Sequence, residues 1–359
     1  MADRPLMRPG VATSPWWRQL LADWRSALIT VLLLALALRL GLSLFDWGLR
    51  HAVWRADAEA CQAARGLGAC WGVLAEKQRL ILFGRYPLAQ QWRPLLASAL
   101  LLGLLLLSGW PRCWRPALAG AWLLGLAAIL LLMGGGAAGL VVVPTELWGG
   151  LPLTLLLSTL SILLACPLAV LLALGRRSRL PLLKALCVLY IELLRGVPLI
   201  SVLFMASFLF PLLLPVGSAP DVLLRVLAGI TLFAAAYLAE TVRAGLQAVP
   251  AGQIEAARSL GLRPWQVQRL VALPQALAAV LPGLLNSFIS VFKDSSLITI
   301  VSLFDLTGAL GLALNGDPVW RPFLFEGYLF ITAIYFAFCA ALSRYGLWLE
   351  RRLARGRGH

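Results

Sequence analysis

Long apolar segments separated by short charged segments dominate this sequence. Eight apolar stretches have about the length, roughly 18 to 20 residues or more, that an α-helix needs to cross a bilayer. These stretches lie at about 26–46, 94–110, 117–133, 151–174, 182–214, 222–246, 275–299 and 324–347. The pattern predicts an all-α integral membrane protein with about eight transmembrane helices, five of them in a core that begins at about residue 151.

One predicted span is interrupted. The stretch 182–214 contains Gly196 and the prolines Pro198 and Pro211, and Pro215 follows directly. A proline inside a helix removes a backbone hydrogen bond and breaks or kinks the helix. We therefore expect a broken span here. The segment 305–321 is polar and contains glycines, and we expect it to precede the last span without crossing the membrane.

The segment between Pro250 and Pro274 is too charged to lie in lipid. Its charged residues are Glu255, Arg258, Arg263 and Arg269. Helical spacing of apolar residues before Gly261, and Pro264 after it, predict two short helices joined at the glycine. The segment should lie outside the membrane, between two spans.

The positions of the basic residues predict an orientation, because short cytoplasmic loops are rich in Lys and Arg. The basic turns 111–115 and 175–179, the 250–274 loop and the C-terminal tail all fall on one side, which should be the cytoplasmic side together with the N-terminus. The expected organisation is a cytoplasmic N-terminus (1–25), an N-terminal membrane region (26–150) with an extracytoplasmic loop (47–93), a membrane domain (151–349) and a basic cytoplasmic tail (350–359). Arg39, inside the first span, should face other helices or lie near a span end.

Composition agrees with a membrane protein. Apolar residues make up 60% of the 359 residues, and the mean hydropathy is +0.85. A net charge of +15 would indicate nucleic-acid binding in a soluble protein. Because the basic residues here lie in short loops beside apolar spans, we expect no nucleic-acid partner.

Motifs for catalysis or nucleotide binding are missing from the sequence. It has no GxxxxGK[ST] phosphate loop and no HExxH, and its only histidines are His51 and His359. We therefore expect no enzyme activity, no metal site and no cofactor in this chain. If transport is driven by ATP, then ATP and Mg²⁺ must be bound by a separate ATPase subunit.

Charged residues within the predicted spans are candidates for a translocation path or gate. Glu192 and Arg195 are three residues apart, as are Glu240 and Arg243, so each pair can meet on one helix face. Lys293 and Asp294 are adjacent and need different partners; Ser295 follows them. The alternative is that these charges only brace helices near the cytoplasmic surface. The sequence leaves both roles open.

Two of the six cysteines, Cys61 and Cys70, lie together in the predicted extracytoplasmic loop. An oxidised pair is plausible outside the cytoplasm. The alternative of two unlinked thiols stays open.

Residues 250–274 also carry a family resemblance. Glu255-Ala256-Ala257, Gly261 after three further residues, and Leu273-Pro274 match the EAA loop of ABC importer permeases. The segments YIELLRGVPLISVLFMASF and LPQALAAVLPGLLNSFISVFKDSSL resemble the polar amino-acid branch of these permeases, and in particular its AapM-type general L-amino-acid permease subunits. The resemblance covers roughly residues 150–350.

This resemblance implies a function and a set of partners. It implies a permease subunit of an ATP-driven importer of L-amino acids in the bacterial inner membrane. The implied partners are ABC ATPase subunits, which contact the EAA loop, a second related permease and a periplasmic amino-acid-binding protein. The main alternative is a secondary transporter driven by an ion gradient, although the sequence shows no matching second half. A membrane-embedded enzyme or a non-transporting scaffold are further alternatives.

Overall fold

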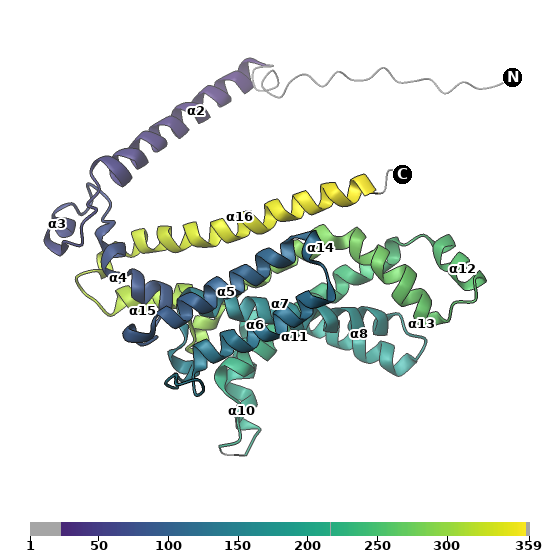
Figure 1. The fold of residues 1–359 in the computed structure, drawn as a ribbon. Helices are drawn as coiled ribbons and strands as arrows, with labels where there is room; N and C mark the ends of the chain where they lie inside the picture. Colours follow the sequence, from purple (N-terminus) through teal and green to yellow (C-terminus); the bar gives the residue numbers. More distant parts are fainter. Residues whose placement is uncertain (1–22, 216, 357–359) are drawn as a thin grey trace. The chain divides into compact units, whose positions relative to one another are not determined.

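The structure is a computed structural model that describes residues 23–215 and 217–356, and it is almost entirely helical (Figure 1). The α-helices are α2 (Trp24–Phe45), α3 (Ala58–Ala63), α4 (Gly72–Phe83), α5 (Trp92–Gly109), α6 (Pro116–Gly134), α7 (Gly150–Arg176), α8 (Pro181–Gly196), α9 (Leu199–Phe204), α10 (Phe210–Leu212), α11 (Val222–Ala248), α12 (Ala251–Ser259), α13 (Pro264–Gln266), α14 (Leu273–Asp294), α15 (Leu306–Asn315) and α16 (Leu324–Gly356).

Short elements connect these helices. The π-helical turns are η1 (Asp46–Arg50), η5 (Met205–Leu209) and η6 (Val267–Ala272). The 3₁₀ turns are η2 (Leu88–Gln90), η3 (Pro111–Cys113), η4 (Thr145–Leu147), η7 (Ser295–Val301) and η8 (Arg321–Phe323), and one two-residue strand is β1 (Phe304–Asp305).

The described residues form two compact units, which divide between residues 75 and 76. Within the first unit, α2 continues into η1 without a break, and the loop after it is held by a disulfide between Cys61 and Cys70, whose Cα atoms are 5.4 Å apart. Both cysteines are fully buried. The indole of Trp71 donates a hydrogen bond to the carbonyl of Gly48 (2.8 Å) and lies against Trp54. The predicted extracytoplasmic loop is therefore folded.

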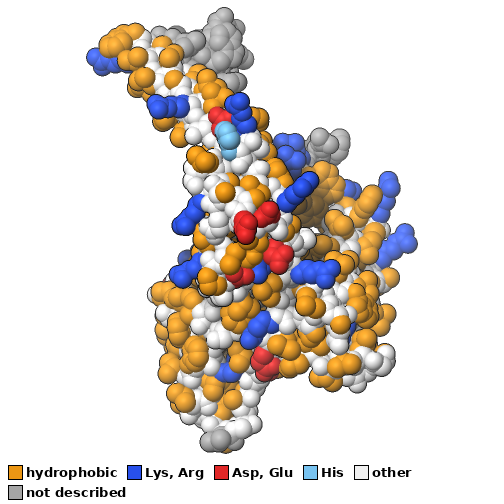
Figure 2. Space-filling model, turned by 90° about the vertical axis from the view of Figure 1, so that its left-hand side faces the viewer, with side chains coloured by type: hydrophobic (Ala, Val, Ile, Leu, Met, Phe, Trp, Pro, Cys, Tyr) orange, Lys and Arg blue, Asp and Glu red, His pale blue; other side chains and the backbone are white. Residues whose placement is uncertain are grey.

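The described residues include seven helical segments that are long and apolar enough to cross a membrane, or eight if the bent pair α8 and α9–α10 counts as one span. This confirms the prediction of an all-α membrane protein with about eight spans. Hydrophobic side chains occupy much of the surface visible in Figure 2, as expected for helices that face lipid. Arg39, on α2, is exposed.

The break in the fifth span lies where its Gly and Pro residues predict it. Helix α8 ends at Gly196, and α9 starts after Pro198 with a bend of 106° between the two helical segments. The π-helical turn η5 then precedes Pro211, which has no N–H to donate to the carbonyl of Ser207. The guanidinium of Arg225, on α11, donates to that carbonyl instead.

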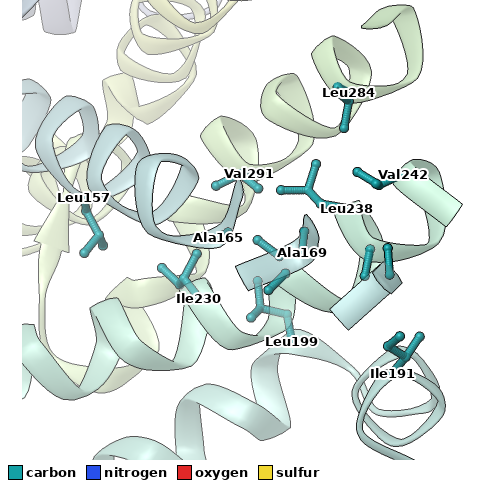
Figure 3. Packing of buried hydrophobic residues seen from close by; sticks show 14 of the residues in the cluster. Leu157, Ala165, Ala169, Ile191, Leu199, Ile230, Leu238, Val242, Leu284 and Val291 are labelled. Atoms are coloured by element: carbon teal, nitrogen blue, oxygen red, sulfur yellow. The ribbon is translucent and has the colours of Figure 1, made fainter. Parts of the chain in front are cut away.

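The core of the second unit is built around α7 and α11. Ala165, Ala169 and Ala173 recur every four residues on α7 and are fully buried. Small residues at this spacing let helix backbones approach closely, which is how helices associate in a membrane. Figure 3 shows Ile230 and Leu238 of α11 in the same cluster as the α7 alanines. This packing holds α7, which ends at Arg176, against α11, which carries Glu240 and Arg243.

Candidate functional site

The EAA loop begins with α12, which ends at Ser259, and Gly261 terminates it two residues later as the sequence predicts. Gly261 has φ +79°, in the left-handed region that glycine adopts without strain. Its N–H donates to the carbonyl of Arg258 (2.9 Å), and the N–H of Leu262 donates to the carbonyl of Ala257 (3.3 Å). These bonds satisfy carbonyls at the helix end and turn the chain back towards the membrane domain.

The residues of the EAA motif face in different directions. Ala257 is buried at 4% exposure, whereas Glu255 and Ala256 are exposed. Ile254, one turn before Arg258, packs against the core of the membrane domain. Leu260 is 82% exposed at the end of α12. The loop is thus anchored through one face and presents a carboxylate, a small residue and a leucine on its other face.

The second helix of the loop differs from the prediction. It is not a separate short helix, because α13 continues through η6 into α14, and the segment Pro264–Val301 is helical without interruption. Pro274 lies within this helical segment and has no N–H that could donate a hydrogen bond to the carbonyl of Leu270. The π-helical turn η6 ends two residues before Pro274. Its wider turn accommodates the hydrogen bond that the proline cannot donate. The second half of the loop is therefore continuous with α14.

The two i,i+3 charge pairs behave differently. Arg243 donates from Nε to Glu240 (2.9 Å), as the spacing predicts. Glu192 does not pair with Arg195; it contacts Arg176 on α7 at 2.9 Å, and Arg176 also contacts Glu240 at 3.3 Å. Arg176, which the sequence analysis did not single out, thus joins α7, α8 and α11 by two ion pairs.

Arg195 forms no ion pair of 4 Å or less with the residues of this cluster. Its guanidinium lies over the ring of Tyr237 on α11, 5.7 Å from the ring centroid. The Tyr237 hydroxyl donates to the backbone carbonyl of Arg195 (3.3 Å). An exposed guanidinium supported by an aromatic ring keeps its hydrogen-bond donors available to a ligand.

The Lys293–Ser295 segment divides between surface and interior. Lys293 is exposed and Asp294 is half-buried, and within the described residues no ion pair of 4 Å or less involves either of them. Ser295 is fully buried, and its hydroxyl donates to the carbonyl of Phe292 (2.7 Å). Only the first two side chains are accessible from outside the chain.

Asp305 forms a buried junction that the sequence analysis missed. Its carboxylate accepts hydrogen bonds from the Thr299 hydroxyl (2.7 Å), the Tyr335 hydroxyl (3.0 Å) and the backbone N–H groups of Thr307 and Gly308. Burial raises the pKa of Asp305, and these hydrogen bonds partly offset the rise. The Thr154 hydroxyl accepts from the N–H of Leu306 (3.0 Å). An aspartate directly before an apolar run is a helix N-cap pattern that could have revealed α15 and its role.

Metal-ligand clusters are not present in the part of the chain that the structure describes: no three His, Cys, Asp or Glu side chains lie together there in a suitable arrangement. Three acidic residues of the membrane domain, Glu192, Glu240 and Asp305, instead contact arginines or accept hydrogen bonds. The accessible guanidinium of Arg195 and carboxylate of Asp294 can contact a charged solute.

Comparison with known proteins agrees with these features. The family described as binding-protein-dependent transport system inner membrane component matches residues 165–355. The inner membrane amino-acid ABC transporter permease protein YhdY of Escherichia coli is 43% identical over 99% of this chain and 96% of its own length. The glutamate/glutamine/aspartate/asparagine transport system permease protein BztC of Rhodobacter capsulatus is 36% identical over 99% of this chain and 97% of its own length.

A solved structure is similar in fold as well. A chain of an amino acid ABC transporter crystallised with histidines superposes with a TM-score of 0.51 at 33% identity, covering 56% of this chain and 92% of that chain. Together with the candidate spans, these matches identify a multi-pass inner-membrane protein that is a transport component rather than an enzyme. The chain belongs to the family of binding-protein-dependent transport system inner membrane components, the permeases of ABC transporters.

Proposed function

We propose that this chain is a permease subunit of an ATP-driven importer of L-amino acids. The observation that carries the proposal is its similarity, over nearly the full length of both chains, to a permease named for amino-acid transport. The geometry of the EAA loop supports it, because the loop presents Glu255, Ala256 and Leu260 outwards and is continuous with α14. ATP and Mg²⁺ would bind to separate ATPase subunits that contact this loop.

The remaining partners follow from the same similarity. A periplasmic binding protein would deliver the amino acid, and a second, related permease would complete the path as a heterodimer. The N- and C-termini would lie in the cytoplasm, on the side of the EAA loop. Glu192, Arg195, Lys293 and Asp294 are the proposed path or gate residues, with Ser295 fixing the helix end beneath them.

Opposite charges in a path suit an amino acid, because its ammonium and carboxylate groups need partners of opposite sign. Arg195 can bind a carboxylate through two parallel hydrogen bonds, and Asp294 can accept from an ammonium group. Both residues have side-chain surface accessible from outside the chain.

The test is reconstitution in liposomes with and without the ATPase, the second permease and the binding protein. We expect uptake of labelled L-amino acids only from the full assembly with ATP, and none from this chain alone under a proton or sodium gradient. A Walker-motif variant of the ATPase serves as the matched control, since it assembles without hydrolysing ATP. Accumulation by this chain alone under an ion gradient would refute the proposal in favour of a secondary transporter.

A further inference from the structure

The last turns of α16 carry a group of arginines that the proposed function does not use. Arg344, Arg351 and Arg352, together with Leu347 and Trp348, line an open surface depression of about 590 Å³. We call this group the α16 arginine patch. The guanidinium of Arg352 lies over the indole of Trp348, 5.5 Å from the ring centroid. The depression therefore combines the positive charge of the arginines with the indole of Trp348.

The patch lies on the face of α16 that points away from the helix bundle. On the opposite face, a side chain at Gly346 would come within 3.0 Å of Leu285 on α14, and Leu349 is buried. At about 100° per residue, Arg344, Trp348, Arg351 and Arg352 share one side of the helix. Glu350 lies about 100° or more from each arginine, so no carboxylate of the same helix shares their face.

The charges of the patch are uncompensated within the described residues. No ion pair of 4 Å or less joins Arg344, Arg351 or Arg352 to a carboxylate there. Three unpaired arginines on one helix face repel one another, and that repulsion falls when a ligand supplies negative charge. The missing partner is therefore an anion.

A second segment with residues typical of a membrane interface follows a contact with α16. Tyr345 lies against Gly109 at the end of α5, where an added side chain would be 3.5 Å from the Tyr345 ring. The turn η3 follows directly and carries Arg112, flanked by the exposed indoles of Trp110 and Trp114. Tryptophan is enriched at the headgroup level of a bilayer, where its ring lies among the glycerol and acyl groups.

We propose that the α16 arginine patch binds the phosphate headgroup of an anionic phospholipid. Arginine guanidinium groups match phosphate oxygens in two-point fashion, and basic pockets at the ends of membrane helices bind anionic headgroups. A lipid fits better than free phosphate or an acidic protein surface, because Leu347 and Trp348, both exposed, provide apolar area beside the charges for the glycerol and upper acyl chain.

The experiment measures lipid binding to the purified full-length chain by native mass spectrometry. The probes are phosphatidylglycerol and phosphatidylcholine with identical acyl chains, each titrated in detergent. Since each arginine near an anionic lipid adds roughly fivefold to its affinity, replacing all three arginines by glutamine should weaken phosphatidylglycerol binding on the order of a hundredfold. Phosphatidylcholine binding should not change.

Two further variants control for net charge and for geometry. The triple change Arg55→Gln, Arg65→Gln and Arg79→Gln removes the same charge from exposed positions elsewhere, and it should leave phosphatidylglycerol binding within twofold of the wild type. The triple change of the patch to lysine keeps the charge but loses the planar fork, so its binding should be intermediate. Size-exclusion profiles equal to the wild type establish that the exposed substitutions leave the fold intact.

Three outcomes would overturn the proposal. The first is unchanged phosphatidylglycerol binding by the glutamine variant of the patch. The second is an equal loss of binding in the Arg55, Arg65 and Arg79 control, which would indicate net charge alone. The third is displacement of the lipid by millimolar inorganic phosphate, which would identify free phosphate as the ligand.

Discussion

Gly261 connects one backbone angle to the proposed coupling function. Its φ of +79° reverses the chain between α12 and α13, so it determines where Glu255 and Leu260 point. No heavy atom lies within 4 Å of the position that a Cβ would occupy. A side chain at this position therefore meets no steric obstacle, and its cost comes only from the left-handed backbone, about 1–2 kcal/mol.

Gly261→Val is expected to weaken ATPase binding while leaving membrane insertion intact. The strained turn would shift α12, and 1–2 kcal/mol corresponds to roughly a five- to thirtyfold loss of affinity. The measurement is co-purification of the ATPase, with uptake of labelled amino acids alongside. Gly261→Asn is the matched control, because asparagine tolerates the left-handed region and should retain most of the binding. Full ATPase binding and uptake by the valine variant would contradict the coupling role.

Arg195 is expected to act through the shape of its guanidinium and not only through its charge. Arg195→Lys keeps the charge but loses both the planar fork and the stacking over Tyr237. The variant should assemble with its partners normally and transport at about one tenth of the wild-type rate or less, because a weakened charge-assisted bond costs about 1.5–3 kcal/mol. Uptake assays on equal amounts of assembled transporter measure this, and normal uptake by Arg195→Ala would leave no path role.

At the scale of elements, periodicity predicted the spans well because lipid imposes a simple rule on helix length and polarity. The predicted ends of the spans were less accurate, because the last helix extends to Gly356, beyond the predicted residue 347. The continuity of α13 with α14 was not predictable, since a proline ordinarily marks a helix boundary and only the π-helical turn η6 removes it. Spacing suggested that Glu192 can pair with Arg195, because it reveals only pairs within one helix. The structure instead pairs Glu192 with Arg176 from another helix.

Asp305, in β1, accepts hydrogen bonds from η7, α15 and α16. Its removal is therefore expected to lower the stability of the fold. Asp305→Ala leaves the hydroxyls of Thr299 and Tyr335 and the start of α15 without their acceptor, which should cost about 2–4 kcal/mol. Asp305→Asn retains one carbonyl oxygen and should cost less than half as much. Thermal unfolding in detergent, followed by tryptophan fluorescence, measures both. An alanine variant as stable as the wild type would show that the junction is not structural.

At the scale of the whole molecule, the chain is longer than the part that it shares with the similar solved structure. The similar solved structure covers 56% of this chain, whereas the permeases of Escherichia coli and Rhodobacter capsulatus match it over 99%. The family match begins at residue 165. Residues 23–75, which include the disulfide-closed loop, therefore lie outside the segment that the family model matches.

The orientation of the chain is open to a direct test with cysteine reporters. Cys113, in the turn η3, is a free and partly exposed thiol, and we expect it in the cytoplasm because its turn is basic. Arg79→Cys places a thiol at an exposed position of the loop 47–93, which we expect outside. Each reporter is examined alone, in a background where the other cysteines of the membrane domain, Cys166, Cys187 and Cys339, are alanine.

A membrane-impermeant maleimide applied to intact spheroplasts should label the reporter at position 79 and not Cys113. Permeabilisation should then expose Cys113 fully. Cys61 and Cys70 stay in the background, because thiols joined in a disulfide do not react unless a reductant is added. Labelling of Cys113 in intact spheroplasts, with protection of position 79, would invert the orientation. The EAA loop would then face away from ATP, and the proposed coupling to an ATPase would fail with it.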